Sequence, residues 1–179
     1  MSHRITFLWT VPRSVSTSFE RMMMERGDHV VFDEPFSRSY YFGPDRRSTR
    51  YTESLPDSSA EQILSQIEEA AGERPVFVKD MAYQAATLLG TDLLKRFGNC
   101  FLVRDPAATS RSLAHRWPDF SDEETGWEWH ASSARSTGFR ELREPPPPPT
   151  PEDGRLHEVY QEALPLYREL SADAIGKTA

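Results

Sequence analysis

Hydroxyl groups and one arginine are concentrated in residues 10–18, which read Thr-Val-Pro-Arg-Ser-Val-Ser-Thr-Ser. The segment follows a short apolar run, 5–9. It precedes a stretch in which Phe19, Met22 and Met23 recur with helical spacing, so we expect one buried helix face. This order predicts a strand, a loop and a helix, an arrangement that aims backbone N–H groups at one point and binds anions. The expected anion site comprises Arg13, Ser14, Val15, Ser16, Thr17 and Ser18.

A second group of polar residues follows the apolar run 101–103. Arg104 stands where this run ends, and Asp105-Pro106 is typical of a helix start, because Pro lacks only an N–H that the first turn does not use. Ser112 lies eight residues after Arg104, about two turns into the expected helix. Both side chains are therefore expected to reach one phosphate from different sides.

Together the two groups resemble the sulfotransferases that use 3′-phosphoadenosine 5′-phosphosulfate (PAPS), and in particular bacterial sulfotransferase-like proteins. That family holds the 5′-phosphosulfate in a loop with the pattern Pro-(Lys/Arg)-Ser-Gly-(Ser/Thr)-Thr, which here reads Pro-Arg-Ser-Val-Ser-Thr over residues 12–17. It holds the 3′-phosphate with an Arg and a Ser eight positions apart, like Arg104 and Ser112. The resemblance covers residues 4–117. It implies PAPS as donor, 3′-phosphoadenosine 5′-phosphate (PAP) as product, and a hydroxyl or amine of a small molecule as acceptor.

The chain departs from the family pattern in three places. Val15 replaces the usual Gly, and because Val disfavours a positive φ, we expect an ordinary backbone there. Arg13 replaces the commoner Lys, which keeps the charge and offers a planar fork to oxygen anions. The sequence around Glu128 reads as a junction where several tens of residues are missing. Such a loss predicts an open sheet edge, lower stability or self-association into a homo-oligomer, and doubtful activity.

Sulfuryl transfer requires neutralisation of the moving charge and a base for the acceptor proton. Arg13 and Lys79 suit the first role. Many family members place a His after the Lys of the third strand, but here Asp80 follows Lys79. Other members use a Glu after the second strand, and Glu34 stands there. The resemblance thus implies Glu34 as the base, held ionised by Arg13 and Lys79, with Asp80 as the second candidate.

The elements that must position these residues alternate along the chain. Apolar runs at 5–9, 29–32, 75–78 and 100–103 are separated by segments with helical periodicity. This alternation predicts an α/β fold, a P-loop-like three-layer α/β/α architecture with a parallel sheet of about four strands. Ligands of such sheets bind at the carboxyl ends of the strands. Four residues that follow predicted strands should converge there: Arg13, Glu34, Lys79 and Arg104.

The chain divides into three expected regions. The resemblance implies a sulfotransferase-like domain over residues 1–139. Composition and periodicity predict a proline-rich linker over 140–154 and an amphipathic helix over 155–179 that packs on the domain. Five consecutive prolines in the linker favour an extended conformation. They serve either as a rigid spacer or as a ligand for a proline-binding module.

Charge and composition limit the class of function. The 179 residues carry a net charge of −7, which argues against a nucleic-acid surface. We expect no membrane span, no leader and no metal site. Cys100 is the one cysteine, and we expect it in the core; a chain without a disulfide suits the cytoplasm. Two alternatives stay open: a non-catalytic sulfotransferase fold that binds a nucleotide or a partner, and a P-loop small-molecule kinase. The kinase would need a Gly-Lys-(Ser/Thr) loop, and residues 10–18 contain neither Gly nor Lys.

Overall fold

The computed structural model describes residues 4–89 and 92–137, together with residues 158, 161 and 165. Its centre is a sheet whose strands lie in the order β2-β3-β1-β4. All three strand pairings are parallel, which confirms the predicted α/β fold. The strands are β1 (Ile5–Thr10), β2 (Val30–Asp33), β3 (Val76–Met81) and β4 (Gly98–Leu102).

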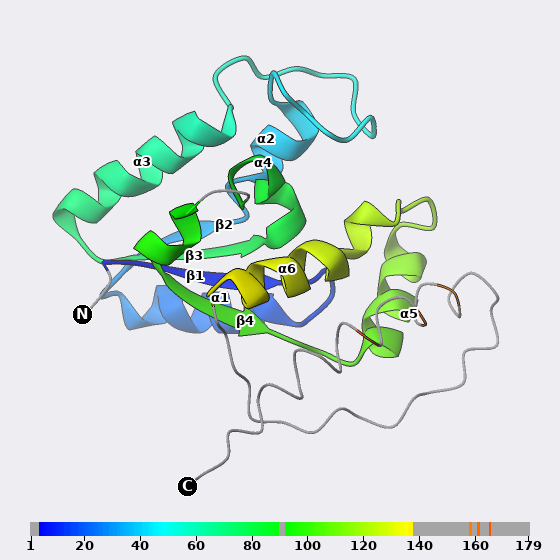
Figure 1. Cartoon of the computed structure of the whole chain (residues 1–179). Coiled ribbons are helices and arrows are strands. Elements are labelled where there is room, and N and C mark those ends of the chain that lie inside the picture. Colours follow the sequence, from blue (N-terminus) through cyan, green and yellow to red (C-terminus); the bar gives the residue numbers. More distant parts are fainter. Residues whose placement is uncertain (1–3, 90–91, 138–157, 159–160, 162–164, 166–179) are drawn as a thin grey trace, which may run out of the picture.

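Helices connect the strands and cover both faces of the sheet. Figure 1 shows α1 on one face, α3, α4 and α6 on the other, and α5 beyond the carboxyl end of the strands. The helices are α1 (Ser16–Arg26), α2 (Ser37–Phe42), α3 (Ala60–Glu73), α4 (Ala86–Leu89), α5 (Pro106–Arg116) and α6 (Trp127–Thr137). Three 3₁₀ turns lie between them: η1 (Ala82–Ala85), η2 (Asp92–Arg96) and η3 (Glu123–Thr125).

Local sequence signals explain where two of these helices begin. The Ser59 hydroxyl accepts a hydrogen bond from the N–H of Gln62, whose side chain bonds back to the N–H of Ser59. This capping box satisfies two donors that a helix start leaves open. At α5, the Asp105 carboxylate accepts from the N–H of Ala107, and Pro106 occupies the first turn. The start at Pro106 was predicted from the sequence.

The larger part of the core lies between the sheet and α3. Phe7 and Trp9 of β1 stack with 4.7 Å between ring centroids, and Val78 and Ile67 are fully buried beside them. The core on the other face of the sheet is smaller, and in it Leu8, Met23 and Phe77 pack between the sheet and α1. The alternation of side chains along each strand therefore supplies both faces with apolar residues.

The burial pattern of α1 differs from the prediction. Of its three expected core residues, only Met23 is buried, whereas Phe19 and Met22 are 42% and 47% exposed. Glu20 takes a buried place instead and is only 4% exposed, since its carboxylate approaches an ion-paired lysine on the sheet. Apolar spacing alone could not reveal that this helix turns a charged side chain inward.

One further expectation is wrong, and others lie outside the described residues. Cys100, expected in the core, is exposed on β4, which lies at the edge of the sheet. The residues around Glu128 belong to the continuous helix α6 (Trp127–Thr137), which buries Trp127 and Ala131. The missing segment at this junction stays a prediction. The predictions for 140–154 and 155–179 fall outside the described part, apart from residues 158, 161 and 165. None of the described helices is long and apolar enough to cross a membrane.

Candidate functional site

The loop between β1 and α1 has an unusual backbone. Arg13 and Val15 adopt left-handed conformations with φ values of 64° and 69°. The expectation of an ordinary backbone at Val15 is therefore wrong: Val adopts the conformation that Gly would adopt more easily. Left-handed residues that alternate with other backbone conformations are typical of anion-binding concavities formed by backbone N–H groups. In this loop the N–H of Ser14 donates to the carbonyl of Val11 over 3.3 Å.

The helix that follows adds to this concavity. Val15 is the N-cap of α1 and provides no side-chain hydrogen bond to it. The first N–H groups of a helix have no partner within the helix, and their dipoles favour a negative charge at this end. In addition, the Ser14 hydroxyl oxygen is buried without a hydrogen-bond partner. The start of α1 therefore offers several donors to an anion.

The two motifs identified in the sequence contact each other directly. The Nε of Arg13 donates to the hydroxyl of Ser112 over 2.9 Å. The Nη1 of Arg104 donates to the backbone carbonyl of Arg13 over 2.7 Å. Segments about 90 residues apart in sequence are thus joined by two hydrogen bonds at the carboxyl end of the sheet.

A cavity of about 380 Å³ opens between these motifs. Its charged lining consists of three arginines and one carboxylate, so it suits an anionic ligand. The sequence did not point to Arg116 or Trp117, although Arg116 follows Ser112 by one helical turn and its place on the same face could have been read from that spacing. The lining residues are Pro12, Arg13, Ser14, Val15, Ser16, Thr17, Glu34, Met81, Arg104, Leu113, Arg116 and Trp117.

Glu34 reaches the cavity because its own backbone is strained. Neighbouring residues of a strand normally point to opposite faces, yet Asp33 and Glu34 both contact the ammonium of Lys79. The φ of 44° at Glu34 breaks the alternation and allows this. The N–H of Glu34 donates to the carbonyl of Lys79 over 2.7 Å, which fixes the turn.

Lys79 is not placed as the sequence predicted. It lies inside β3 rather than after it, is 2% exposed, and does not line the cavity. Its Nζ lies 2.7 Å from the carboxylate of Asp33, contacts Glu34, and is 3.7 Å from Glu20. Burial alone would lower the pKa of Lys79, but the carboxylates of Glu34 and Asp33 outweigh it and raise the pKa. Lys79 is therefore a charged anchor for acidic groups.

Glu20 completes this cluster from α1. Its buried Oε2 has no hydrogen-bond partner. Burial and the nearby charge of Asp33 raise the pKa of Glu20, and the attraction to Lys79 offsets this only in part. The cluster links α1 to the ends of β2 and β3 beneath the cavity. The sequence did not point to Glu20, because an acidic residue in a helix usually faces solvent.

Asp80 is completely buried and does not line the cavity. Its carboxylate accepts hydrogen bonds from the N–H of Phe36 over 2.9 Å and from the N–H of Met81 over 2.7 Å. Burial raises its pKa well above the usual value, and these two bonds reduce the effect. Asp80 thus ties the chain after β2 to the end of β3.

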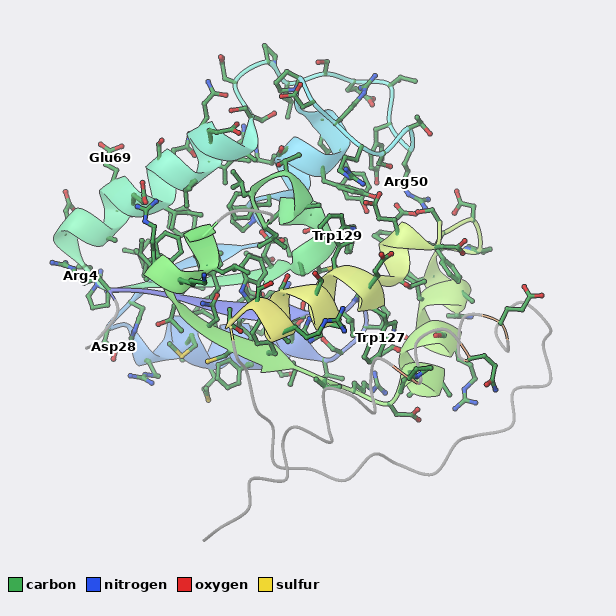
Figure 2. The ribbon with its side chains drawn as sticks, viewed as in Figure 1. Arg4, Asp28, Arg50, Glu69, Trp127 and Trp129 are labelled. Atoms are coloured by element: carbon green, nitrogen blue, oxygen red, sulfur yellow. The ribbon has the colours of Figure 1, made fainter. Side chains whose placement is uncertain are left out.

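A second charged network lies next to the cavity. The guanidinium of Arg50 binds the buried Glu124 and the exposed Asp119, and it lies 5.2 Å from the ring of Trp117, which lines the cavity. Figure 2 shows Arg50 beside the turn before α6, while Arg4 and Asp28 mark the opposite end of the sheet. The network closes with hydrogen bonds from Arg47 and Tyr40 to Glu123. The hydroxyls of Tyr40 and Tyr41 on α2 are therefore occupied within the fold, by Glu123 and Glu124.

In residues 4–89 and 92–137, no three His, Cys, Asp or Glu side chains are grouped so as to hold a metal ion. Comparison with protein-family models gives no match for this chain, and comparison with curated proteins gives none either. The cavity and the residues that form it are therefore the features that indicate a function.

Proposed function

We propose that the chain is a sulfotransferase that transfers a sulfuryl group from PAPS to a hydroxyl or amine of a small-molecule acceptor. One observation carries the proposal: Arg13 and Arg104, one from each motif, line the same cavity and are joined by a hydrogen bond. Ser112 does not line the cavity but accepts a hydrogen bond from Arg13. Glu34 lines the same cavity and supplies a carboxylate.

The donors around the cavity suit a ligand with anionic groups at two positions. In this proposal the loop N–H groups and Arg13 hold the 5′ end of the donor, and Arg104 and Ser112 hold its 3′-phosphate. Guanidinium groups bind phosphate and sulfate oxygens through two parallel N–H bonds, and Arg116 adds a third positive charge. When bound, PAPS supplies a sulfuryl group attached to a phosphate that is a good leaving group. The arginines neutralise negative charge on the sulfuryl group and on the leaving phosphate.

Glu34 accepts the proton of the acceptor in this proposal. The new oxygen–sulfur or nitrogen–sulfur bond forms as the bond between sulfur and the bridging phosphate oxygen breaks, and the acceptor proton passes to a Glu34 carboxylate oxygen. Lys79 acts on Glu34 rather than on the transferred group, since its Nζ pairs with Glu34 and Asp33 and stays outside the cavity. It holds the carboxylate in position through this ion pair.

Nucleotide binding is the first test. PAP should bind about 10- to 100-fold more tightly than 5′-AMP in isothermal titration calorimetry, because one charge-assisted contact contributes about 1.5–3 kcal/mol. Arg13→Ala should weaken PAP binding without lowering the melting temperature, whereas Arg21→Ala, an exposed arginine of the same helix region, should leave binding unchanged. Equal affinity of the wild type for PAP and 5′-AMP would contradict the proposal.

A second assay separates the enzyme from its alternatives. Transfer of labelled sulfate from PAPS to a panel of phenols, alcohols and amines is expected for a sulfotransferase. A non-catalytic nucleotide-binding fold would bind PAP tightly and transfer nothing. A kinase would bind ATP in preference to PAP and transfer phosphate instead.

A further inference from the structure

Arg104 contacts a part of the site that its place in the sequence did not suggest. The resemblance pairs Arg104 with the 3′ end of the donor and the loop 12–17 with the 5′ end. In the structure, however, the half-buried Arg104 donates from Nη1 to the backbone carbonyl of Arg13, within that loop. The side chain of Arg13 in turn donates to Ser112 on α5. Two hydrogen bonds therefore join the residues expected at the 5′ end of the donor to those expected at its 3′ end. Arg104 donates to the loop, and Arg13 of the loop donates to Ser112.

The loop needs such support. Left-handed conformations at residues with a Cβ, here Arg13 and Val15, cost about 1–2 kcal/mol each and persist only where the surroundings hold them. One backbone bond inside the loop, from the N–H of Ser14 to the carbonyl of Val11, is long at 3.3 Å. The bond from Arg104 is shorter, at 2.7 Å, and its donor is charged. It is the stronger of these two restraints on Arg13.

We propose that Arg104 is a positioning residue for the loop 12–17, so that the two anion subsites are coupled; this inference rests on the proposed function. A guanidinium has five N–H donors, so the bond to the Arg13 carbonyl leaves others for a phosphate. Loss of Arg104 then weakens binding at the 5′ end as well as at the 3′ end. By linkage, an anion at either end strengthens binding at the other.

Adenosine 5′-diphosphate tests this role, because it has no 3′-phosphate for Arg104 to contact. Arg104→Met keeps the unbranched stem and removes every donor. Calorimetry should show about 10-fold weaker binding of this nucleotide to Arg104→Met than to the wild type. Arg104→Lys retains one donor group and should recover part of the affinity. Arg111→Ala, an exposed arginine of α5 outside the cavity, should match the wild type.

The outcomes separate this inference from the proposed function. Unchanged binding of adenosine 5′-diphosphate to Arg104→Met, with weaker binding of PAP, would show that Arg104 is only a phosphate contact and would overturn the inference alone. A wild type that binds neither nucleotide would overturn the proposed function and the inference together.

A measurement on the unmodified chain makes the test independent of whether the variants fold. Adenosine 3′-monophosphate at saturating concentration should raise the affinity for inorganic pyrophosphate by about 5-fold or more, the usual range for coupled sites. Independent or competitive binding of these two probes would overturn the coupling.

Discussion

At the scale of single residues, the site is where the backbone is strained. Within the described part of the chain, positive φ values at residues other than Gly occur at Arg13, Val15 and Glu34, and all three line the cavity. Such conformations cluster at functional sites because surrounding contacts must hold them. Arg13 is held by Arg104, and Glu34 by its ion pair with Lys79. Val15 has no comparable restraint on its side chain, which is 60% exposed.

Val15→Gly should therefore stabilise the protein. Relief of the left-handed strain is worth about 1–2 kcal/mol, and the greater freedom of Gly in the unfolded chain removes about half of it. We expect the free energy of unfolding to rise by about 0.5–1 kcal/mol in urea titrations, with PAP affinity retained. Val15→Ala keeps a Cβ and should gain less. A lower free energy of unfolding for Val15→Gly would mean that the Val side chain stabilises the loop.

Glu34→Gln keeps the shape of the side chain and removes its basicity. Because general-base catalysis contributes about 10²–10⁴-fold, turnover of PAPS should fall by that order while the affinity for PAP changes little. Steady-state rates and calorimetry on the same preparation check both parts.

Asp80→Asn is the matched control for Glu34→Gln. An Asn side chain has one acceptor oxygen for the two N–H groups of Phe36 and Met81, and its own N–H₂ would be buried. We expect a loss of stability of about 1–3 kcal/mol with little direct effect on turnover. If Asp80→Asn abolished turnover and Glu34→Gln did not, Asp80 would be the base.

At the scale of elements, the sequence predicted the parts with local signals. The strand, loop and helix around residues 5–26 have the predicted order, and the helix after Arg104 begins at Pro106 as expected. Helix α6 was missed because Trp127–Thr137 mixes aromatic residues with Ser, Glu and His, and no clear apolar stripe marks it. Its burial depends on contacts with distant segments, which periodicity does not encode.

The candidate site was predicted only in part, because the sequence indicates the strand topology but not the partners of individual side chains. The approach of Arg13, Arg104 and Glu34 to one cavity follows from strand topology. The ion pairs that keep Lys79 away from the cavity follow from two side chains, Glu20 and Asp33, whose partners the sequence does not reveal.

Arg50 links the segment after α2 to the turn before α6. Removal of one partner of a buried ion pair leaves the other charge unpaired, so Arg50→Ala should lower the free energy of unfolding by about 3 kcal/mol in urea titrations. The Arg50→Ala/Glu124→Gln double variant should recover part of the loss. Arg46→Ala removes only exposed bonds to the carbonyls of Thr52 and Glu53 and should cost far less. Equal losses for both single variants would contradict a specific role for Arg50.

At the scale of the whole molecule, one buried residue should set part of its response to acid. His130 is fully buried between Phe101 and Trp127, and neither ring nitrogen has a hydrogen-bond partner. Burial lowers its pKa from 6.5 to about 3. Below pH 6.5, His130 therefore binds a proton in the unfolded chain but stays neutral in the folded chain. The free energy of unfolding falls as the pH drops from 6.5 toward 3.

His130→Phe should remove this dependence. We expect it to raise the free energy of unfolding by about 1–3 kcal/mol at pH 7.5, because two unpaired polar atoms leave the core. The difference from the wild type should then grow by about 1.4 kcal/mol for each pH unit below 6.5. Urea titrations at pH 7.5, 6 and 5 measure this. The exposed His115→Phe is the control, and a difference that stays constant with pH would refute the assignment.

The strand order also determines when the strands can pair while the chain is being synthesised. β1 pairs with β3 and β4, both of which come later in the chain, and Ile5 meets Val76. At about 5–20 residues per second, a ribosome needs roughly 4–14 s to make the intervening ~70 residues. During that interval β1 has neither of its neighbouring strands to pair with. The loop that follows β1 gains its contacts with Arg104 and Ser112 later still, so the complete anion site forms only after both motifs have been synthesised.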